Sequence, residues 1–560
     1  MEILKGVKGL NVSKLLFLVG ITLLLLVSAC SNGNSEKVDN EKNEPNTTNP
    51  TKEGTAEVQE NFNEMGMPIV NEPITLHFMT GKPPLTAEDY NEVLIWKKYA
   101  EMTNINIDWG LTPREGLEEK RNLSLASGEY PEVFYSSGLL DTDLYKYGRQ
   151  GVFIQLNDLI DEYMPNLKAL FEQYPEIKKG MTFPDGSIYS LPTIYSPDFI
   201  SVTSHTKPYI KKDWLEQLGM EVPQTTEEFY QYLKKVKETD LNGNGKHDEI
   251  PFGSTNIATL EFYLKGSFDV GNRGSRHSFL DVDPERGDLR FFRISESYKE
   301  LLQFMNKLFS EGLIEEKIFS IDENQFQATG SEGFYGSTVT TNPETRWGVK
   351  DEYVGMPALK GPKGDQKWVY VTSSLANKGG FAITDKNNNP EATVRWMDYF
   401  YGDEGTKLYF MGIEGETYQV TADGEIEYMD HITDPPEGIT MQQAQRPYLT
   451  YLGGGYPGIV KQEFFKGAES LPSSIEATKE FEKYIIDDVW PDFTYTSDEY
   501  DKLIPLQTDI HKYADEMRDK FISGDASFSE WDKYVETIER MGLDKYMEIQ
   551  KQAYERYKNS

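Results

Sequence analysis

The fold class of this 560-residue chain follows from residues 74–111, which read ITLHFMTGKPPLTAEDYNEVLIWKKYAEMTNINIDWGL. Residues 74–80 form a short apolar run that predicts a strand. Residues 87–103 carry apolar side chains at helical spacing, and a second extended run follows at 105–111. A strand, a helix and a second strand in succession favour a parallel sheet with helices on its faces, so we expect an α/β fold.

The same alternation continues along the chain. A helix is expected at 117–127, a short buried strand at 132–135 and a helix at 156–163, and a second alternating region opens near Tyr209. The helix predicted at 226–239 has Thr225 or Thr226 as its N-cap and two glutamates in its first turn, where the helix dipole favours them. The further predicted helices are 297–311, 390–401, 404–411, 474–486 and those of the C-terminal run 499–557.

The N-terminus carries a secretion signal. Three lysines precede an apolar run at residues 15–26, and the tetrapeptide VSAC follows at 27–30. A positive start, a short apolar segment and small residues before the cut mark a signal peptide, and the tetrapeptide resembles a bacterial lipobox. We therefore expect residues 1–29 to be removed and Cys30, the only cysteine, to carry lipid, palmitate included. Two acyl chains hold a protein stably on a membrane.

The alternative for this segment is a signal-anchor helix with an incidental cysteine. A run of 12 apolar residues is too short for that, because a bilayer core is roughly 30 Å thick. Residues 30–65 are rich in Asn, Glu, Lys, Thr and Pro and predict a disordered tether. The expected location is the extracellular face of the cell membrane, with the body held by its lipid anchor.

The composition is strongly acidic. The formal charge is −35, and removal of residues 1–29, which carry a net +2, would bring it to −37. No basic tract remains, which disfavours nucleic acid and anionic lipid as partners. A chain of this length with 34 Tyr, 29 Phe and 8 Trp is expected to form at least two domains. Trp96, Trp214 and Trp396 lie at apolar helical spacing, so we assign them to the core.

The most specific motif of the body is DLNGNGKHDEIP at residues 240–251. Asp240, Asn242 and Asn244 place oxygen donors at alternate positions, and Gly245 permits a sharp turn, as in the first half of an EF-hand loop. Hard oxygen donors favour Ca²⁺ over Zn²⁺, which prefers His and Cys. The predicted ligands of a structural calcium ion are Asp240, Asn242, Asn244, the Lys246 carbonyl, Asp248 and Glu249.

This motif departs from an EF-hand at its end. Pro251 stands at the twelfth position, where an EF-hand has a bidentate glutamate, so Asp248 and Glu249 have to supply the closing carboxylates. The alternative is a simple acidic Asn-Gly turn between a helix and a strand. Because protein ligands would fill the coordination sphere, we expect a structural metal and no catalytic role for it.

Six segments spread over most of the body carry a family likeness. They are LSLASGEYPEVF at 123–134, GVFIQLNDLI at 151–160, KDWLEQLG at 212–219, the loop at 240–249, LKGPKG at 359–364 and GIEGETY at 412–418. With the lipobox, their order resembles the family 1 extracellular solute-binding lipoproteins of ABC importers. Within that family, they resemble the LipO-like branch related to alginate-binding and oligosaccharide-binding proteins.

The resemblance implies a two-lobed, periplasmic-binding-protein-like α/β fold whose crossover segments act as a hinge. Residues 66–200 and 365–425 would form lobe one, and residues 201–364 and 426–560 lobe two. It also implies that the loop at 240–249 binds calcium, and that the partners are an oligosaccharide and the permease subunits of an ABC importer. We expect a monomer.

A sugar presents apolar C–H faces and a rim of hydroxyls, so its site combines aromatic rings with polar side chains. We looked for such residues at strand ends, near the first crossover and in loop-like or glycine-rich segments. The predicted ligand-binding residues are Tyr135, Ser136, Tyr195, Asp198, Arg346, Trp347, Glu414, Tyr418 and Tyr456. The alternative for each aromatic is core packing, and the alternative for Arg346 is a surface ion pair.

The predicted function is extracellular capture of an oligosaccharide and its delivery to an ABC permease, without catalysis. One rival class is an anchored polysaccharide hydrolase, which needs two carboxylates at a set separation, and another is a peptide-binding lipoprotein. The sequence has no G-x-S-x-G, H-E-x-x-H or Walker motif, and its six histidines are scattered. It does not specify the sugar, the length or charge of that sugar, or the permease.

Overall fold

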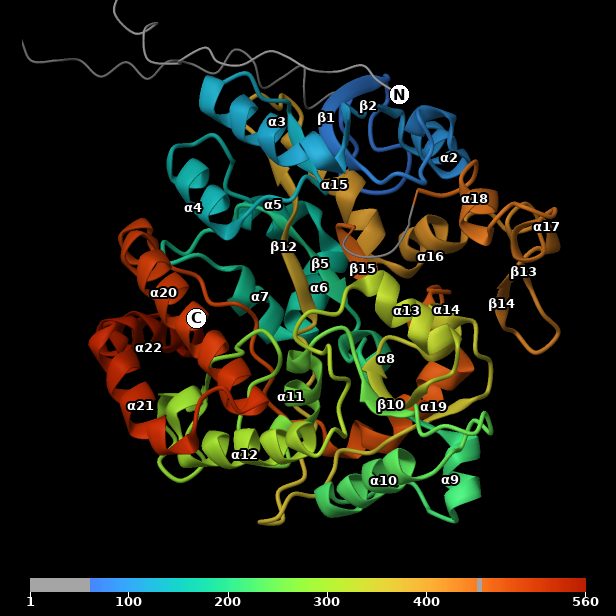
Figure 1. The fold of residues 1–560 in the computed structure, drawn as a ribbon. Helices are drawn as coiled ribbons and strands as arrows, with labels where there is room; N and C mark the ends of the chain where they lie inside the picture. The colour runs from blue at the N-terminus through green and yellow to red at the C-terminus, as the bar shows by residue number, and fades with distance from the viewer. Residues whose placement is uncertain (1–60, 451–455) are drawn as a thin grey trace, which may run out of the picture. The chain divides into compact units, whose positions relative to one another are not determined.

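The strand, helix and strand expected at the start of the body are present (Figure 1). β1 (Ile74–Lys82) pairs in parallel with β2 (Ile105–Asp108), and α2 (Leu94–Thr103) connects them. α2 ends at Asn104, which has a left-handed backbone at φ 59° and donates its N–H to the Ala100 carbonyl. The computed structural model describes residues 61–450 and 456–560.

The first sheet has seven strands, in the order β15-β5-β12-β4-β1-β2, with β3 also paired to β1. β12 runs antiparallel to both β4 and β5, so the sheet is mixed where the sequence favoured a parallel one. Close packing requires glycine on β12, because a Cβ at Gly379 would lie 2.4 Å from the Leu139 carbonyl oxygen. The remaining strands are β3 (Leu111–Pro113), β4 (Val133–Tyr135), β5 (Leu191–Tyr195), β12 (Leu375–Ile383) and β15 (Gly458–Val460).

The second sheet has four strands in the order β11-β6-β10-β7. Its central strands β6 (Lys207–Lys211) and β10 (Tyr335–Thr340) are buried along their whole length. The outer strands are β7 (Ile250–Gly253) and β11 (Tyr353–Gly355). Two-stranded pairs β8 (Leu280–Val282) with β9 (Leu289–Phe291) and β13 (Tyr418–Val420) with β14 (Ile426–Tyr428) lie outside both sheets.

The helices agree closely with the predicted ones. α10 (Thr226–Glu238) starts with a capping box, in which the Thr225 hydroxyl accepts the Glu228 N–H and the Glu228 carboxylate accepts the Thr225 N–H. In the N-terminal half the other helices are α3 (Arg114–Ser127), α4 (Asp141–Arg149), α5 (Asn157–Tyr163), α6 (Pro165–Gln173), α7 (Pro175–Met181), α8 (Ile200–Thr203), α9 (Lys212–Leu218) and α11 (Ile257–Lys265). In the C-terminal half they are α12 (Glu296–Ser310), α13 (Glu323–Ser331), α14 (Pro343–Trp347), α15 (Pro390–Asp398), α16 (Asp403–Met411), α17 (Asp430–Thr433), α18 (Met441–Gln445), α19 (Pro472–Phe481), α20 (Ser497–Ser523), α21 (Trp531–Arg540) and α22 (Leu543–Asn559).

Each sheet has its own hydrophobic core. Trp96 and Trp396 lie in the core of the seven-stranded sheet, and Trp214 lies in the larger core shared by the four-stranded sheet and the C-terminal helices. All three tryptophans are buried, as predicted. The C-terminal helices α20, α21 and α22 pack on one another, and α20 lies against α12 (Figure 1).

The chain passes between the two sheets at residues 195–207, 355–375 and 460–472. Hydrogen bonds tie these crossovers together: the Thr372 N–H donates to the Thr203 carbonyl at 2.9 Å, and the Ser201 hydroxyl donates to the Glu469 carbonyl at 2.6 Å. β15, which the predicted lobe limits placed in lobe two, pairs with β5 of the seven-stranded sheet. The lobe limits themselves stay a prediction.

The signal peptide, Cys30 and most of the expected tether lie outside the described residues. The last part of that segment, residues 61–65, belongs to the folded body, because Phe62 packs against Tyr163 and the Asn63 N–H donates to the Ile69 carbonyl at 2.9 Å. Within the described ranges, no helix combines the length and apolar character that a membrane crossing requires.

Candidate functional site

A cavity of about 490 Å³ lies where the segment after β4 meets the loops and helices of the C-terminal half. Ligands of open α/β sheets bind beyond the carboxyl ends of the strands, and the segment after β4 leaves the sheet at such an end. Its lining residues are Leu140, Asp141, Thr142, Arg276, His277, Ser278, Phe279, Leu280, Asp492, Phe493, Tyr495, Tyr500, Leu503, Ile504, Gln507, His511, Tyr546 and Gln550.

A second cavity, of about 560 Å³, is lined by the start of α10, Phe268, α12 and residues 360–363. It has no lining residue from the segment after β4, so closure of the two lobes would not enclose it. The cavity of about 490 Å³ takes residues from both halves of the chain, and we treat it as the candidate ligand site.

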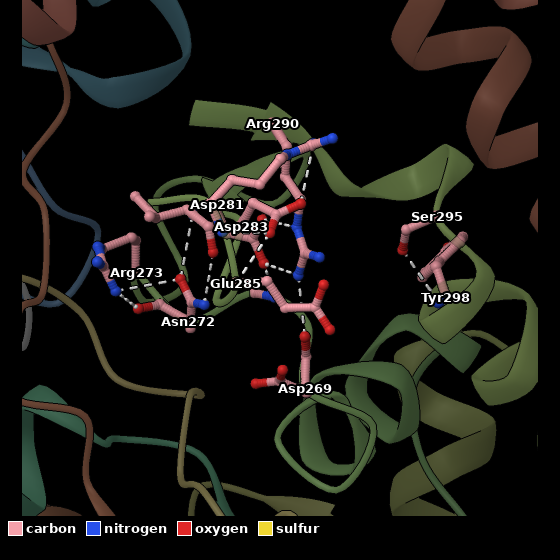
Figure 2. A network of polar contacts seen from close by, with 12 residues as sticks. Asp269, Asn272, Arg273, Asp281, Asp283, Glu285, Arg290, Ser295 and Tyr298 are labelled. Atoms are coloured by element: carbon pink, nitrogen blue, oxygen red, sulfur yellow. Dashed lines mark hydrogen bonds and ion pairs between the residues drawn. The ribbon is translucent and has the colours of Figure 1, made fainter. Parts of the chain in front are cut away.

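The loop that carries Arg276, His277 and Phe279 into the cavity is held from behind by a buried ion pair (Figure 2). The Arg290 guanidinium donates to both oxygens of Asp281, through Nε at 2.6 Å and Nη2 at 3.0 Å. Asp281 Oδ2 also accepts the Gly271 N–H at 2.8 Å, at the start of the loop. Asn272 adds two hydrogen bonds to the main chain of Val282. These contacts fix the loop before a ligand arrives.

The charged groups at the cavity are paired with one another. Arg276 Nη1 lies 3.2 Å from Asp492 Oδ2, and its Nε donates to the Thr372 hydroxyl at 3.0 Å. The buried Lys378 donates through Nζ to Asp141 Oδ2 at 2.7 Å and to the Asp492 carbonyl at 2.8 Å. Lys378 lies on β12 of the seven-stranded sheet and Asp492 lies between α19 and α20, so these contacts join that sheet to the C-terminal segment at the cavity.

Two histidines of the cavity are neutral at physiological pH. Burial lowers the pKa of His277, whose Nε2–H donates to the Pro491 carbonyl at 2.8 Å. Burial, with the charge of Arg293, lowers the pKa of His511 to about 3. The His511 ring stacks on Phe279 with the ring centres 3.5 Å apart, and its Nε2 lies 3.1 Å from the Tyr546 hydroxyl.

The cavity combines apolar surface with hydroxyl and amide groups. The lining residues Leu140 and Ile504 are each about half exposed, at 55% and 51%. Tyr495 donates its hydroxyl to the Gln550 amide oxygen at 2.7 Å, and the Tyr500 ring packs against it. Rings that can cover C–H faces beside groups that can bind hydroxyls suit a sugar.

None of the nine predicted ligand-binding residues lines this cavity. Tyr135, Tyr418 and Tyr456 are buried in the core of the seven-stranded sheet, where Tyr135 and Tyr456 cluster with Tyr409. Trp347 is 6% exposed and packs against Phe326, Tyr335 and Tyr353. The segment expected as a loop around Trp347 is helix α14, because Pro343 opens it and the Asn342 side chain caps it.

The other five predicted residues lie nearer the surface, at separate places. Ser136 follows β4 with a left-handed backbone at φ 45°, and its N–H donates to the Gly380 carbonyl. Tyr195 and Asp198 lie on the first crossover, and Glu414 is exposed in the turn before β13. Arg346 forms an ion pair with Glu323 at 2.6 Å, which is the alternative considered for it. Ligand contact by any of the nine stays a prediction.

The cavity residues that the sequence analysis missed come from four segments, at 140–142, 276–280, 492–511 and 546–550. Residues 271–280, GNRGSRHSFL, offered a usable signal, because glycines beside Arg, His and Phe are typical of a binding loop. Asp141 and Tyr500 offered none, since each stands in the first turns of an ordinary amphipathic helix.

The loop at 240–249 connects α10 to β7 and makes the turn that the motif predicted. Gly245 has φ 81°, and its N–H donates to Asp240 Oδ2 at 2.8 Å. The amide groups of Asn242 and Asn244 both donate to the Asp248 carboxylate. Glu249 is buried; its Oε1 accepts two main-chain N–H groups, and its Oε2 has no hydrogen-bond partner.

An orphaned buried carboxylate oxygen in a loop of oxygen donors fits a bound cation. In the described part of the chain, no three His, Cys, Asp or Glu side chains converge as a ready-made metal site. A calcium ion in this loop would therefore need oxygens from Asn242, Asn244 and the main chain beside the three carboxylates.

Comparisons with known proteins agree with the fold. Residues 84–407 match the model of the bacterial extracellular solute-binding protein family. The fructooligosaccharide ABC transporter substrate-binding protein FusA of Streptococcus pneumoniae is 32% identical over 507 residues, covering 87% of this chain and 91% of FusA. The polygalacturonan/rhamnogalacturonan-binding protein YtcQ of Bacillus subtilis is 24% identical and covers 82% of this chain and 88% of its own.

A solved structure of FusA, an EF-hand mutant in complex with fructo-nystose, superposes with a TM-score of 0.68 at 29% identity, covering 87% of this chain and 100% of FusA. These relatives are binding proteins and not enzymes. The match to the family model over residues 84–407, together with the 32% identity to FusA, shows that the chain belongs to the bacterial extracellular solute-binding proteins.

Proposed function

We propose that the protein captures an oligosaccharide outside the cell and delivers it to the permease of an ABC importer. The observation that carries this proposal is a cavity of about 490 Å³, built from both halves of the chain and lined by aromatic, hydroxyl and amide groups. A volume of this size is in the usual range for small-ligand sites. The relative FusA, at 32% identity, is named for fructooligosaccharide, which makes short fructose oligomers the first sugars to test.

The membrane anchor is part of the proposal. The lipobox-like tetrapeptide at 27–30 supports lipid attachment at Cys30, with palmitate among the acyl chains. The segment before residue 61 would then act as a tether that lets the body reach the permease from the extracellular face. We expect a monomer, since one two-lobed chain holds a whole site.

A structural calcium ion in the loop at 240–249 is also part of the proposal. The orphaned Glu249 oxygen and the turn at Gly245 support it, and so does the fact that the matched FusA structure is described as an EF-hand mutant. The ion would hold the end of α10 to the start of β7, at the edge of the four-stranded sheet. It would have no part in sugar binding.

The test is isothermal calorimetry of the full chain with kestose and nystose, with short peptides as a control and mass analysis of the sugar afterwards. Saturable binding of intact sugar supports the proposal. Cleaved sugar would make the protein a hydrolase, and binding of peptides alone would make it a peptide receptor.

A variant tests whether this cavity is the sugar-binding site. Phe279→Ala removes one ring of the cavity. The matched control is Phe319→Ala, which removes a ring that is 37% exposed and does not line the cavity. We expect the first to weaken sugar binding about tenfold or more and the second to leave it unchanged. Equal affinities in the two variants would exclude this cavity as the site.

A further inference from the structure

We infer that the cavity selects a neutral oligosaccharide. Asp492 sets this specificity because it pairs with Arg276, the cation that an acidic sugar would need. The inference rests on the proposed function and names its substrate class. The two relatives differ in this respect by name: FusA is named for a fructooligosaccharide, which is neutral, and YtcQ for polygalacturonan, a polymer of an acidic sugar.

Among the described residues that line the cavity, Arg276 is the only lysine or arginine. Its guanidinium is already committed on three sides. Nη1 lies 3.2 Å from Asp492 Oδ2, Nε donates to the Thr372 hydroxyl at 3.0 Å, and Nη2 donates to the Ala376 carbonyl. Thr372 lies on a crossover and Ala376 on β12, so the Arg276 side chain binds both the crossover and the seven-stranded sheet.

The second acidic group of the lining, Asp141, is paired with a buried lysine. Asp141 accepts the Lys378 ammonium at 2.7 Å, and the Lys378 side chain is only 5% exposed, so it cannot reach a ligand in the cavity. Two carboxylates therefore face two cations. The two lining histidines add no charge, because burial lowers the pKa of both His277 and His511. The cavity thus has no spare positive charge.

A sugar carboxylate would meet this arrangement badly. It could pair only with Arg276, and there it would lie beside the Asp492 carboxylate. Asp141 is close by, because Lys378 donates both to it and to the Asp492 carbonyl. Like charges held close together repel, and an interface built this way rejects the wrong ligand. A sugar hydroxyl faces no such cost, because it can donate to either carboxylate and accept from the guanidinium without a change in net charge.

The loop network strengthens the inference, because it prevents Arg276 from simply moving away with a new partner. Residues 271–280 are fixed by Asp281, Arg290 and Asn272, as Figure 2 shows. Arg276 is thus presented from a rigid loop. If Arg276 exchanged Asp492 for a ligand carboxylate, the loop that carries Arg276 would stay in the same position, beside Asp492.

The test compares matched sugars and matched variants of the full chain by calorimetry. The neutral sugars are kestose and nystose, and the acidic sugars are tri- and tetragalacturonate of the same lengths. For the natural chain, we expect the neutral sugars to bind at least about a hundredfold more tightly than the acidic ones. Asp492→Asn keeps the side-chain shape, removes the charge and frees Arg276. It should raise the affinity for the galacturonates about tenfold or more, with a stronger dependence on salt.

The control is Asp488→Asn. Asp488 forms a similar exposed ion pair with Arg273 at 3.3 Å, but it does not line the cavity. We expect this variant to leave both affinities unchanged.

Each outcome decides between the claims. Galacturonates that bind the natural chain as well as the neutral sugars do would overturn the inference while the proposed function stands. An Asp492→Asn variant whose galacturonate affinity does not rise would remove Asp492 as the determinant. If no sugar of either kind binds the natural chain, the proposed function itself fails.

Discussion

Asp398 shows how one buried carboxylate makes stability depend on pH. It is the last residue of α15 and accepts the Asn166 and Leu167 main-chain N–H groups at 3.2 and 2.9 Å, in the first turn of α6. Burial raises the pKa of Asp398 from 3.8 to about 6, in spite of these hydrogen bonds. The folded state thus holds a proton that the unfolded chain releases at lower pH.

The sign of the resulting pH dependence follows from this difference in pKa. The contribution of Asp398 is fully present below about pH 4 and is lost as the pH rises to about 6, because only the folded state is still protonated in that window. Two pKa units correspond to roughly 3 kcal/mol. We expect Asp398→Asn to remove this part of the slope. Urea unfolding of both proteins from pH 4 to pH 7 measures it, and two parallel curves would refute the prediction.

Glu249 tests the calcium loop. Glu249→Gln keeps a side-chain oxygen that can accept the two main-chain N–H groups but removes the charge that would meet a cation. Calcium at a hundred times its dissociation constant stabilises a protein by about 2.7 kcal/mol. We expect added calcium to raise the melting temperature of the natural chain and a chelator to lower it, while Glu249→Gln responds much less.

The control for this variant is Glu238→Gln, at the exposed end of α10 just before the loop. It should respond to calcium like the natural chain. Identical melting curves with calcium and with chelator, for all three proteins, would reject the metal site.

At the scale of elements, the loop between α11 and α12 shows how a polar network presents a binding site (Figure 2). It includes β8 and β9, and its apolar side chains, Phe279, Leu280 and Phe291 among them, are buried in the core. The Asp281–Arg290 pair adds a buried polar contact between the two strands. Asp281 is fully buried, and its burial raises its pKa even beside the guanidinium of Arg290. A buried carboxylate of this kind depends on its partner.

Arg290→Met is therefore expected to destabilise the protein by roughly 3 to 5 kcal/mol, since it leaves Asp281 buried without its cation. It should also weaken sugar binding, because Arg276 and Phe279 lose their fixed positions. Denaturant unfolding and calorimetry measure the two effects. Adding Asp281→Asn to this variant should recover part of the stability.

The matched control on the same loop is Arg286→Met. Arg286 pairs with Asp283 at 2.9 Å, but its side chain is 67% exposed. An exposed ion pair contributes less than about 1 kcal/mol. If Arg286→Met and Arg290→Met cost the same, burial is not what makes the network hold the loop.

At the scale of the whole molecule, the three crossovers between the sheets form one hydrogen-bonded unit that contains a buried lysine. Lys207, at the start of β6, is fully buried, and its ammonium donates to the Ser201 carbonyl at 2.9 Å. Burial lowers the pKa of Lys207 to about 8, although the nearby Glu469 opposes the shift. A charge at this point ties α8 to the second sheet.

The pH dependence of Lys207 has the opposite sign to that of Asp398. Between about pH 8 and 10.5 the unfolded chain holds the proton and the folded chain has lost it, so stability gains up to roughly 3 kcal/mol as the pH rises. We expect Lys207→Met to lack this gain. Urea unfolding across that range measures it, and the other groups that titrate there, Lys265 and the tyrosines, are common to both proteins. An unchanged difference between the two across that range would contradict the prediction.

Much of the fold could be read from local pattern. The first strand, helix and strand, the capping box at Thr225, the turn at Gly245 and the burial of Trp96, Trp214 and Trp396 all depend on periodicity, capping and backbone preference within a few residues. The antiparallel course of β12 could not be read this way. Strand direction within a sheet depends on where the chain returns from, and β12 returns from the second sheet.

The sequence by itself determined the α/β class, the family resemblance and the metal-loop motif, because each is carried by residues close together in the chain. Only the tertiary structure decided which residues share the cavity. Arg276, Asp141 and Asp492 are more than a hundred residues apart, and their burial and charge pairing arise from contacts between the two halves. For the same reason Trp347, which stands in a loop-like sequence, is a core residue.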